Sequence, residues 1–182
     1  MNALQKLMTQ YKAQGLGTDD TERAWALSKN ELDKFRTIAQ QRLLGVPWEY
    51  ITGEVTFCGR RFCVDERVYI PNPETEIMVR AVMAQLKPAQ TVVDLGTGCG
   101  NIAITIKKEY PRVAVVATDI SCSALEVAQQ NATRHKVIVK LVQSCHAYDL
   151  ALNPQVIVAN LPYGDKNHLL EAISYRKSLL IT

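Results

Sequence analysis

The chain has 182 residues, of which 47% are hydrophobic and 21% charged, as is usual for a globular protein with a sizeable core. Its net charge of +3 is too small to indicate a nucleic-acid ligand by itself. The five cysteines contain no C-x-x-C pair, and the three histidines share no metal-ligand spacing, so we expect reduced thiols in a cytoplasmic protein without a metal site. No apolar run approaches the roughly 18 residues that span a bilayer, and no signal-peptide cleavage site follows the N-terminus.

The first quarter of the chain is predicted to be helical. Leu4, Leu7, Met8 and Tyr11 recur at spacings of three and four residues, and two later segments begin with capping-type residues. Residues 1–45 are therefore expected to form a small helical domain. Aromatic and β-branched residues follow, and the segment 46–71, with a turn at Gly59, is predicted to be a β-hairpin that links two domains.

A regular alternation of helices and strands fills the rest of the chain. Asn72 can cap a helix that begins at Pro73. The strands that follow are apolar on both faces, as in a parallel sheet covered by helices. Residues 72–182 are thus predicted to form a doubly wound α/β domain, with strands at 91–95, 113–118, 137–142 and 155–159 and helices at 100–110 and 122–135.

A glycine-rich loop follows the first strand of this domain. The stretch "DLGTGCGNIA" places Asp94 at the strand end, before Gly96, Gly98 and Gly100. Its third glycine comes one residue earlier than in the dinucleotide-binding pattern G-x-G-x-x-G. A strand-end aspartate repels a phosphate and attracts an ammonium group, which favours S-adenosylmethionine as the ligand. An ordinary strand-to-helix turn is the alternative reading of the glycines.

A second acid supports this cofactor assignment. Asp119 ends the second strand about 20 residues past the loop, where a carboxylate can accept hydrogen bonds from both ribose hydroxyls. Taken alone, the same residue could equally be a helix N-cap. The loop and the acid together predict a site for an adenosyl cofactor.

The fourth strand runs into the sequence Asn160-Leu161-Pro162-Tyr163, whose position predicts a substrate site beside the cofactor. The Asn160 side chain and the Leu161 carbonyl offer two acceptors for the two hydrogens of an NH₂ group, since Pro162 has no N–H to compete for that carbonyl. Tyr163 can stack on a planar amide or base. Adenine, cytosine and a glutamine side chain all carry such a group, and a hydrophobic strand followed by a Pro-Tyr turn has the same sequence.

The segment from Arg42 to Glu76, together with the glycine loop and the asparagine-proline-tyrosine motif, resembles the HemK-type release-factor glutamine methyltransferases. Their pattern is approximately R-x-x-G-x-P-x-x-Y-I-x-G, then F-x-G, then I-P-R-P-E-T-E. The resemblance implies a substrate-recognition domain, a hairpin linker and a Rossmann-like class I methyltransferase domain acting on the GGQ glutamine of peptide chain release factors. It also implies two sites. The cofactor site would consist of Asp94, Gly96, Thr97, Gly98, Gly100, Asp119, Cys145 and Asn160. The substrate and catalytic site would consist of Asn160, Leu161, Pro162 and Tyr163.

The chain departs from the family pattern in four places. Asn72 replaces an arginine, Leu161 replaces a proline, and Cys145 stands where an acid often lies near the adenine. The chain also ends before the last strands of the family's sheet, so we expect an incomplete domain whose apolar edge allows self-association. An RNA or DNA amino-methyltransferase and a non-catalytic cofactor-binding module stay open as alternatives.

Overall fold

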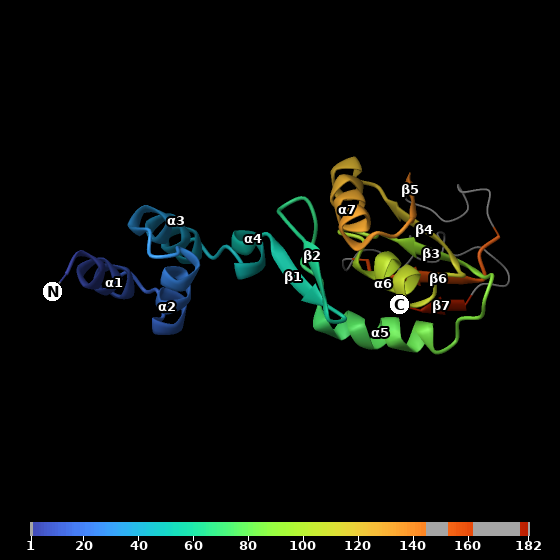
Figure 1. Ribbon diagram of the computed structural model, residues 1–182, viewed down its shortest axis with the longest axis horizontal. Coiled ribbons are helices and arrows are strands. Elements are labelled where there is room, and N and C mark those ends of the chain that lie inside the picture. Colours follow the sequence, from blue (N-terminus) through green and yellow to red (C-terminus); the bar gives the residue numbers. More distant parts are fainter. Residues whose placement is uncertain (1, 145–152, 162–178, 182) are drawn as a thin grey trace. The chain divides into compact units, whose positions relative to one another are not determined.

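A computed structural model describes residues 2–144, 153–161 and 179–181 of the chain. The chain divides into two compact units, residues 1–53 and residues 54–182. The labelled elements of both units are shown in Figure 1. Within the described residues, no helix is long and apolar enough to cross a membrane, and no group of three or more histidine, cysteine or acidic side chains could hold a metal ion.

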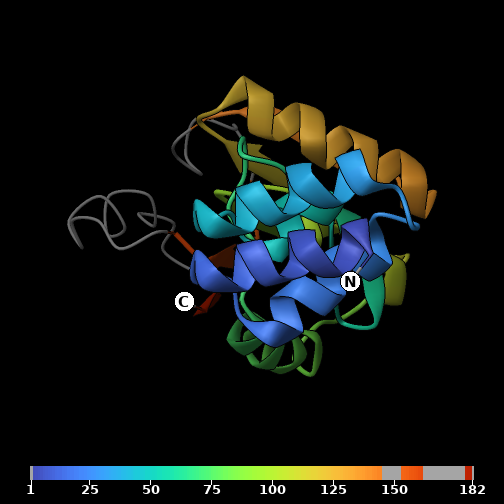
Figure 2. The ribbon, with the colours of Figure 1, turned by 90° about the vertical axis from the view of Figure 1, so that its left-hand side faces the viewer.

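The first unit is a bundle of four helices around one apolar cluster. The helices are α1 (Ala3–Ala13), α2 (Thr18–Leu27), α3 (Leu32–Leu43) and the short α4 (Trp48–Thr52). The first three are coloured in shades of blue in Figure 2. A capping box between Asn2 and Gln5 begins α1, which satisfies two backbone N–H groups at that helix end. The buried cluster consists of Tyr11, Leu16, Ala24, Phe35, Ala39 and Trp48.

Polar and aromatic side chains of the Arg42 segment have a structural use inside this unit. Arg42 donates to Asp20 Oδ2 at 3.0 Å, and the indole Nε1 of Trp48 donates to Asp20 Oδ1 at the same distance. Arg42 also donates to the Val46 carbonyl, at 2.5 Å. The guanidinium of Arg23 lies 4.5 Å from the Trp48 ring centroid, a cation–π distance. These contacts fix the chain between α3 and α4.

The boundary between the two units differs from the sequence prediction. It lies after Gly53 rather than at residue 45, and Trp48–Thr52 form a helix where a hairpin segment was predicted. Trp48 is buried in the cluster of the first unit, so tertiary packing outweighs the strand preference of its aromatic and β-branched neighbours. Gly53, with a left-handed φ of 72°, ends α4 and lets the chain turn into the next strand.

The predicted hairpin is confirmed, in a shorter form, at the start of the second unit. Strand β1 (Glu54–Phe57) pairs antiparallel with β2 (Arg60–Cys63), and Phe57 lies opposite Arg60. The two turn residues, Cys58 and Gly59, have φ angles of 46° and 70°. Two successive positive φ angles define the type I′ turn that matches the twist of a two-residue hairpin.

Helix α5 (Pro73–Met83) leads from the hairpin to the sheet. Asn72 is its N-cap, as predicted, and accepts a hydrogen bond from the Glu74 backbone N–H at 2.9 Å. Pro73 occupies the first helical position, where its missing N–H costs nothing. Glu76 accepts from the Cys58 backbone N–H at 2.9 Å, so the first turn of α5 is fastened to the hairpin turn.

The sheet of the second unit has five parallel strands in the order β5-β4-β3-β6-β7. The strands are β3 (Thr91–Leu95), β4 (Ala114–Asp119), β5 (Lys140–Gln143), β6 (Val156–Ala159) and β7 (Leu179–Ile181). Four of them, β3 to β6, correspond to the strands predicted from the sequence, with differences at their ends. The strand order reverses between β4 and β6, on either side of β3, which creates a switch point at the carboxyl end of β3.

Three helices pack in a row against this sheet. Helix α6 (Asn101–Glu109) joins β3 to β4 and contacts both α5 and α7 (Cys122–His135), as seen in Figure 1. The buried residues of α6 include Ile102, Ile104 and Ile106, and those of α7 recur at helical spacing. Residues 168–175, whose sequence could supply one more helix, lie outside the described residues.

Candidate functional site

The carboxyl end of β3 carries a buried acid beneath the glycine loop. Asp94 is 0% exposed, and its Oδ2 accepts from the Thr97 hydroxyl at 2.7 Å and from the Ala103 backbone N–H at 3.2 Å. Its Oδ1 has no hydrogen-bond partner among the described residues. Burial raises the pKa of Asp94 to about 7, although both hydrogen bonds oppose the shift. Asp94 therefore holds the loop from below, whereas the sequence predicted a carboxylate open to the ligand.

The loop itself needs glycine for backbone conformation and for close packing. Gly96, Gly98 and Gly100 have φ angles of 67°, 53° and 82°, a region that other residues rarely adopt. A Cβ on Gly96 would overlap with Cδ2 of Leu161. A Cβ on Gly100 would lie 3.2 Å from Cβ of Ala128, in helix α7. The loop is therefore pressed between the end of β6 and the helix layer.

Asp119 at the end of β4 is bonded to the same loop. Its Oδ2 accepts from the Gly98 backbone N–H at 2.9 Å, and its Oδ1 accepts from the Ser121 backbone N–H at 2.9 Å. Ser121 is the N-cap of α7, so the alternative reading of Asp119 as that cap is wrong. A carboxylate has about four lone-pair positions, and each oxygen of Asp119 thus keeps one for a further donor.

A buried amide fastens the loop to the hairpin. Asn131 of α7 is 0% exposed, and its Nδ2 donates to the carbonyls of Cys99 and Cys63, both at 2.9 Å. Its Oδ1 accepts from the Cys63 backbone N–H at 2.7 Å. Both hydrogens of the amide are used, which fixes its orientation. Cys99 lies in the glycine loop and Cys63 ends β2, so one side chain holds three segments together.

Sequence reasoning missed Asn131, although the sequence contained a signal. The buried positions of α7 are Ala124, Val127, Ala128, Asn131 and Ala132. An asparagine thus occupies one of the positions at i, i+3, i+4, i+7 and i+8 that form the apolar face of a helix. A polar residue at such a position must find hydrogen-bond partners, which would have marked Asn131 as a structural junction.

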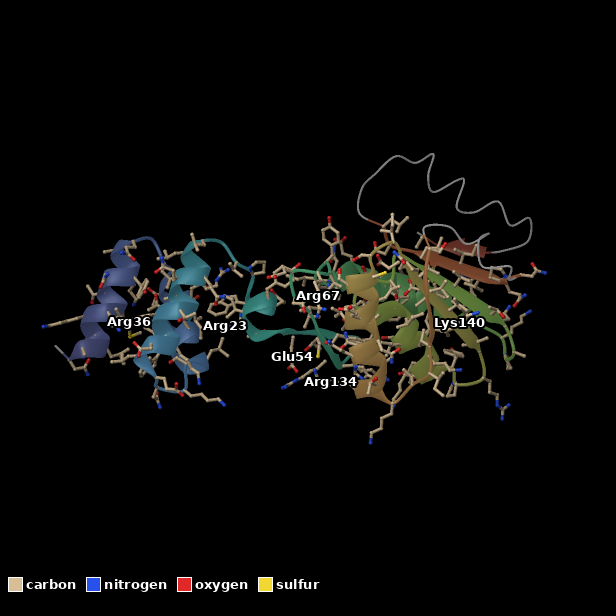
Figure 3. All side chains as sticks on the ribbon, turned by 90° about the horizontal axis from the view of Figure 1, so that it is seen from above. Arg23, Arg36, Glu54, Arg67, Arg134 and Lys140 are labelled. Atoms are coloured by element: carbon tan, nitrogen blue, oxygen red, sulfur yellow. The ribbon has the colours of Figure 1, made fainter. Side chains whose placement is uncertain are left out.

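An ion pair adds to the attachment of the hairpin. Figure 3 shows Arg134 of α7 beside Glu54 of β1, and the N–O distance between them is 2.6 Å. The hydrogen bond from Arg134 lowers the pKa of Glu54, despite partial burial. Arg67, labelled in the same view, pairs with Asp65 at 2.7 Å and with Glu126 of α7 at 3.0 Å. These arginines are therefore neutralised by acids of the same unit.

The end of β6 lies next to the end of β3, as the substrate-site prediction requires. Leu95 is the register partner of Ala159, so Gly96 and Asn160 follow on adjacent strands. Leu161 is 41% exposed and contacts Gly96 through its side chain. Asn160 Nδ2 donates to the Thr75 hydroxyl of α5 at 2.8 Å. Nothing in the residue pattern indicated that Thr75 would reach this site.

The structure brings most of the predicted site residues to one edge of the sheet. Asp94, the loop Gly96–Gly100, Asp119, Asn160 and Leu161 all lie at the carboxyl ends of β3, β4 and β6. Cys145, Pro162 and Tyr163 lie outside the described residues. Ser144 just before Cys145 donates its backbone N–H to the Asp119 carbonyl at 3.1 Å, which brings the end of β5 to the same edge.

Residues 71–176 match the methyltransferase small domain family. The match spans more than half of the chain, and the chain belongs to this family. Its parallel sheet, with a glycine loop after β3 and an acid after β4, is consistent with that membership. The predicted fold class, a Rossmann-like class I methyltransferase sheet, is thereby confirmed.

Two curated relatives give a more specific comparison than the family model does. The chain is 39% identical over 151 residues to the release factor glutamine methyltransferase of Chlorobaculum tepidum, covering 75% of this chain and 51% of that protein. It is 45% identical over 136 residues to the release factor glutamine methyltransferase of Neisseria gonorrhoeae, covering 71% and 50%. The chain thus spans about half the length of the curated relatives that it matches.

Solved structures share the fold. A tRNA m1G37 methyltransferase of M. jannaschii has a TM-score of 0.55 and 22% sequence identity, covering 67% of this chain and 39% of that one. At this identity the likeness concerns the architecture of the sheet and its helices.

Proposed function

We propose that this chain transfers a methyl group from S-adenosylmethionine to the side-chain amide nitrogen of the glutamine in the GGQ motif of a peptide chain release factor. The observation that carries the proposal is the juxtaposition of the glycine loop and Asn160 at the ends of adjacent strands. The identity with release factor glutamine methyltransferases supports the choice of substrate.

The residues at the loop fit an adenosyl cofactor. Asp119 keeps lone pairs for two ribose hydroxyls while its bonds to the Gly98 and Ser121 N–H groups hold it in place. The loop backbone is open at Gly98, where an added Cβ would meet no atom within 4 Å, so a ligand can approach its peptide group closely. The unpartnered Oδ1 of Asp94 is an acceptor beneath the loop, and the ammonium group at the amino-acid end of such a cofactor would favour the ionised form of this carboxyl.

Two acceptors would hold the substrate amide. The Oδ1 of Asn160 and the backbone carbonyl of Leu161 each accept one N–H of the glutamine side chain, which keeps its nitrogen directed toward the cofactor loop. An amide nitrogen is a poor nucleophile because its lone pair is delocalised into the carbonyl. Holding both hydrogens favours the pyramidal nitrogen, whose lone pair is localised, so orientation and preorganised dipoles supply most of the rate.

When bound, S-adenosylmethionine supplies an electrophilic methyl group on a sulfonium. The protein would need no general base before transfer, since the amide nitrogen keeps its hydrogens while the N–C bond forms and the sulfur–methyl bond breaks, and would lose one proton to solvent afterwards. In this proposal Pro162 has no N–H to compete for the Leu161 carbonyl, and the aromatic ring of Tyr163 is suited to stack on a planar amide.

The proposal is tested with a release factor purified from cells that lack this methylation. The chain is incubated with it and with labelled S-adenosylmethionine, and the GGQ peptide is analysed by mass spectrometry. We expect one methyl group on the glutamine with the wild-type chain. Asn160→Ala should reduce turnover about 100-fold and leave cofactor affinity unchanged, because Asn160 contacts the substrate rather than the cofactor.

The same experiment separates the alternatives. Cofactor binding without methylation of the release factor would favour a non-catalytic module. Methylation of RNA or DNA in place of the release factor would favour a nucleic-acid amino-methyltransferase. Arg67 and Arg134 would contribute little to that second activity, since both are paired with acids of the same unit.

A further inference from the structure

The amide of Asn160 can present either of two chemically opposite atoms to a substrate. Its oxygen accepts hydrogen bonds and its nitrogen donates them, and a half-turn about one bond exchanges the two. The amide lies at an exposed strand end, where nothing intrinsic to asparagine selects one orientation. A glutamine NH₂ group requires the oxygen. Catalysis therefore depends on whatever sets the direction of this amide.

The hydroxyl of Thr75 contacts the nitrogen end of that amide. Asn160 Nδ2 donates to Thr75 Oγ1 at 2.8 Å, which is the one hydrogen bond that the Asn160 side chain makes to the described residues. Because the amide nitrogen of Asn160 is bonded to Thr75 of α5, the amide oxygen stays available to a hydrogen-bond donor of the substrate. Thr75 is only 6% exposed, so water competes poorly for this bond.

Thr75 is itself held on a fixed backbone. It lies in the first turn of α5, where its N–H donates to the Asn72 carbonyl at 3.0 Å and Asn72 caps the helix. The next residue, Glu76, accepts from the Cys58 N–H of the hairpin turn. In a helix the χ1 angle of threonine is restricted to two main rotamers, and the one adopted by Thr75 directs its hydroxyl at the Asn160 amide.

We propose that Thr75 is a positioning residue, whose hydroxyl fixes the Asn160 amide so that its oxygen faces the amino group of the substrate. The inference rests on the proposed function, because it assigns the direction of an acceptor to a substrate that donates N–H. It also gives the first turn of α5 a role in selecting substrates that offer hydrogen-bond donors at this point. A substrate that offers only an acceptor is refused, since it would face the Asn160 oxygen.

Two matched substitutions test this role. Thr75→Val keeps the branched shape and removes the hydroxyl, and Thr75→Ser keeps the hydroxyl and removes a methyl group. We expect Thr75→Val to lower kcat about 10- to 100-fold, as a misdirected reacting group does. Thr75→Ser should stay within about threefold of wild type, and both variants should bind S-adenosylmethionine with wild-type affinity, because Thr75 acts on the substrate side.

Three results would overturn the proposal. The first is a Thr75→Val enzyme with wild-type kcat. The second is an equal loss of kcat in both variants, which would indicate packing of the methyl group instead of a hydrogen bond. The third is a parallel loss of cofactor affinity and melting temperature, which would indicate a general structural defect.

A second measurement keeps this inference separate from the proposed function. If the wild-type chain fails to methylate the release factor, the function proposed above is wrong. The hydrogen bond between Asn160 and Thr75 is then tested by measuring the exchange rates of the Asn160 side-chain amide protons by NMR. Two distinct, slowly exchanging amide protons in wild type and Thr75→Ser, and rapidly exchanging protons in Thr75→Val, support a fixed amide. Identical exchange in all three proteins contradicts it.

Discussion

Replacing Asp94 by asparagine should change how the stability of the second unit depends on pH. The carboxyl is 0% exposed, and burial raises its pKa from 3.8 to about 7 in the folded protein. The nearby charge of Asp119 contributes to the same shift. Asparagine has nearly the same shape, and its Oδ1 can accept from Thr97 and Ala103 as the Asp94 Oδ2 does. It has no proton to lose.

The sign and size of the effect follow from linkage between protonation and folding. Between the two pKa values the folded chain holds a proton that the unfolded chain has lost, so stability falls as pH rises. The contribution is fully present below pH 3.8 and is lost as pH rises through about 7. Between about pH 5 and about pH 8 the loss is about 2.5 kcal/mol, because each unit of pKa difference corresponds to roughly 1.4 kcal/mol.

Urea unfolding followed by far-UV circular dichroism, at several pH values, measures this effect. Both tryptophans, Trp25 and Trp48, lie in the first unit, so their fluorescence provides an internal control that Asp94→Asn should not alter. His135, whose pKa is lowered by burial, changes stability on the acidic side equally in both proteins and cancels in the comparison. A difference between wild type and Asp94→Asn that stays constant across the range would refute the reasoning.

Three further substitutions test other parts of the structure. Asn131→Ala should lower the free energy of unfolding by about 2–4 kcal/mol in urea titrations, since three backbone groups of Cys63 and Cys99 lose their partner; a loss below about 0.5 kcal/mol would argue against the junction. Asp119→Ala should weaken S-adenosylmethionine binding about 10- to 100-fold by calorimetry, with Asp119→Asn closer to wild type, and unchanged affinity would contradict the assignment. Asp20→Ala should destabilise the first unit by about 1–3 kcal/mol in tryptophan fluorescence, because Arg42 and Trp48 both donate to it, while the transition of the second unit stays in place.

Elements with strong local signals could be predicted from the sequence. Helix α7 begins and ends at the predicted residues, after a serine N-cap and with basic residues in its last turn. Strand β3 also has its predicted bounds, because an apolar run bounded by turn residues identifies a buried strand. The cap of α5 at Asn72 was predicted for the same kind of reason, namely a capping residue directly before proline.

Features that depend on contacts between distant segments could not be predicted. Helix α4 has a sequence that favours a strand, and it becomes helical where Trp48 enters the core of the first unit. The hydrogen bond from Asn160 to Thr75 joins residues far apart in the sequence, and neither residue type by itself indicates which partner it will have. Periodicity and capping describe neighbours along the chain, so the pairs that complete the site became visible only in three dimensions.

The three hydrogen bonds of Asn131 couple the hairpin mechanically to the glycine loop. The Cys99 carbonyl and both backbone groups of Cys63 share one rigid amide, so neither segment can shift without straining the other. A ligand that makes the glycine loop more rigid should therefore also make the hairpin more rigid. Protection against amide hydrogen exchange should then increase in both the loop and the hairpin. Conversely, a protein that binds and orders the hairpin would raise the affinity of the loop for its ligand, since coupling between two binding sites is reciprocal.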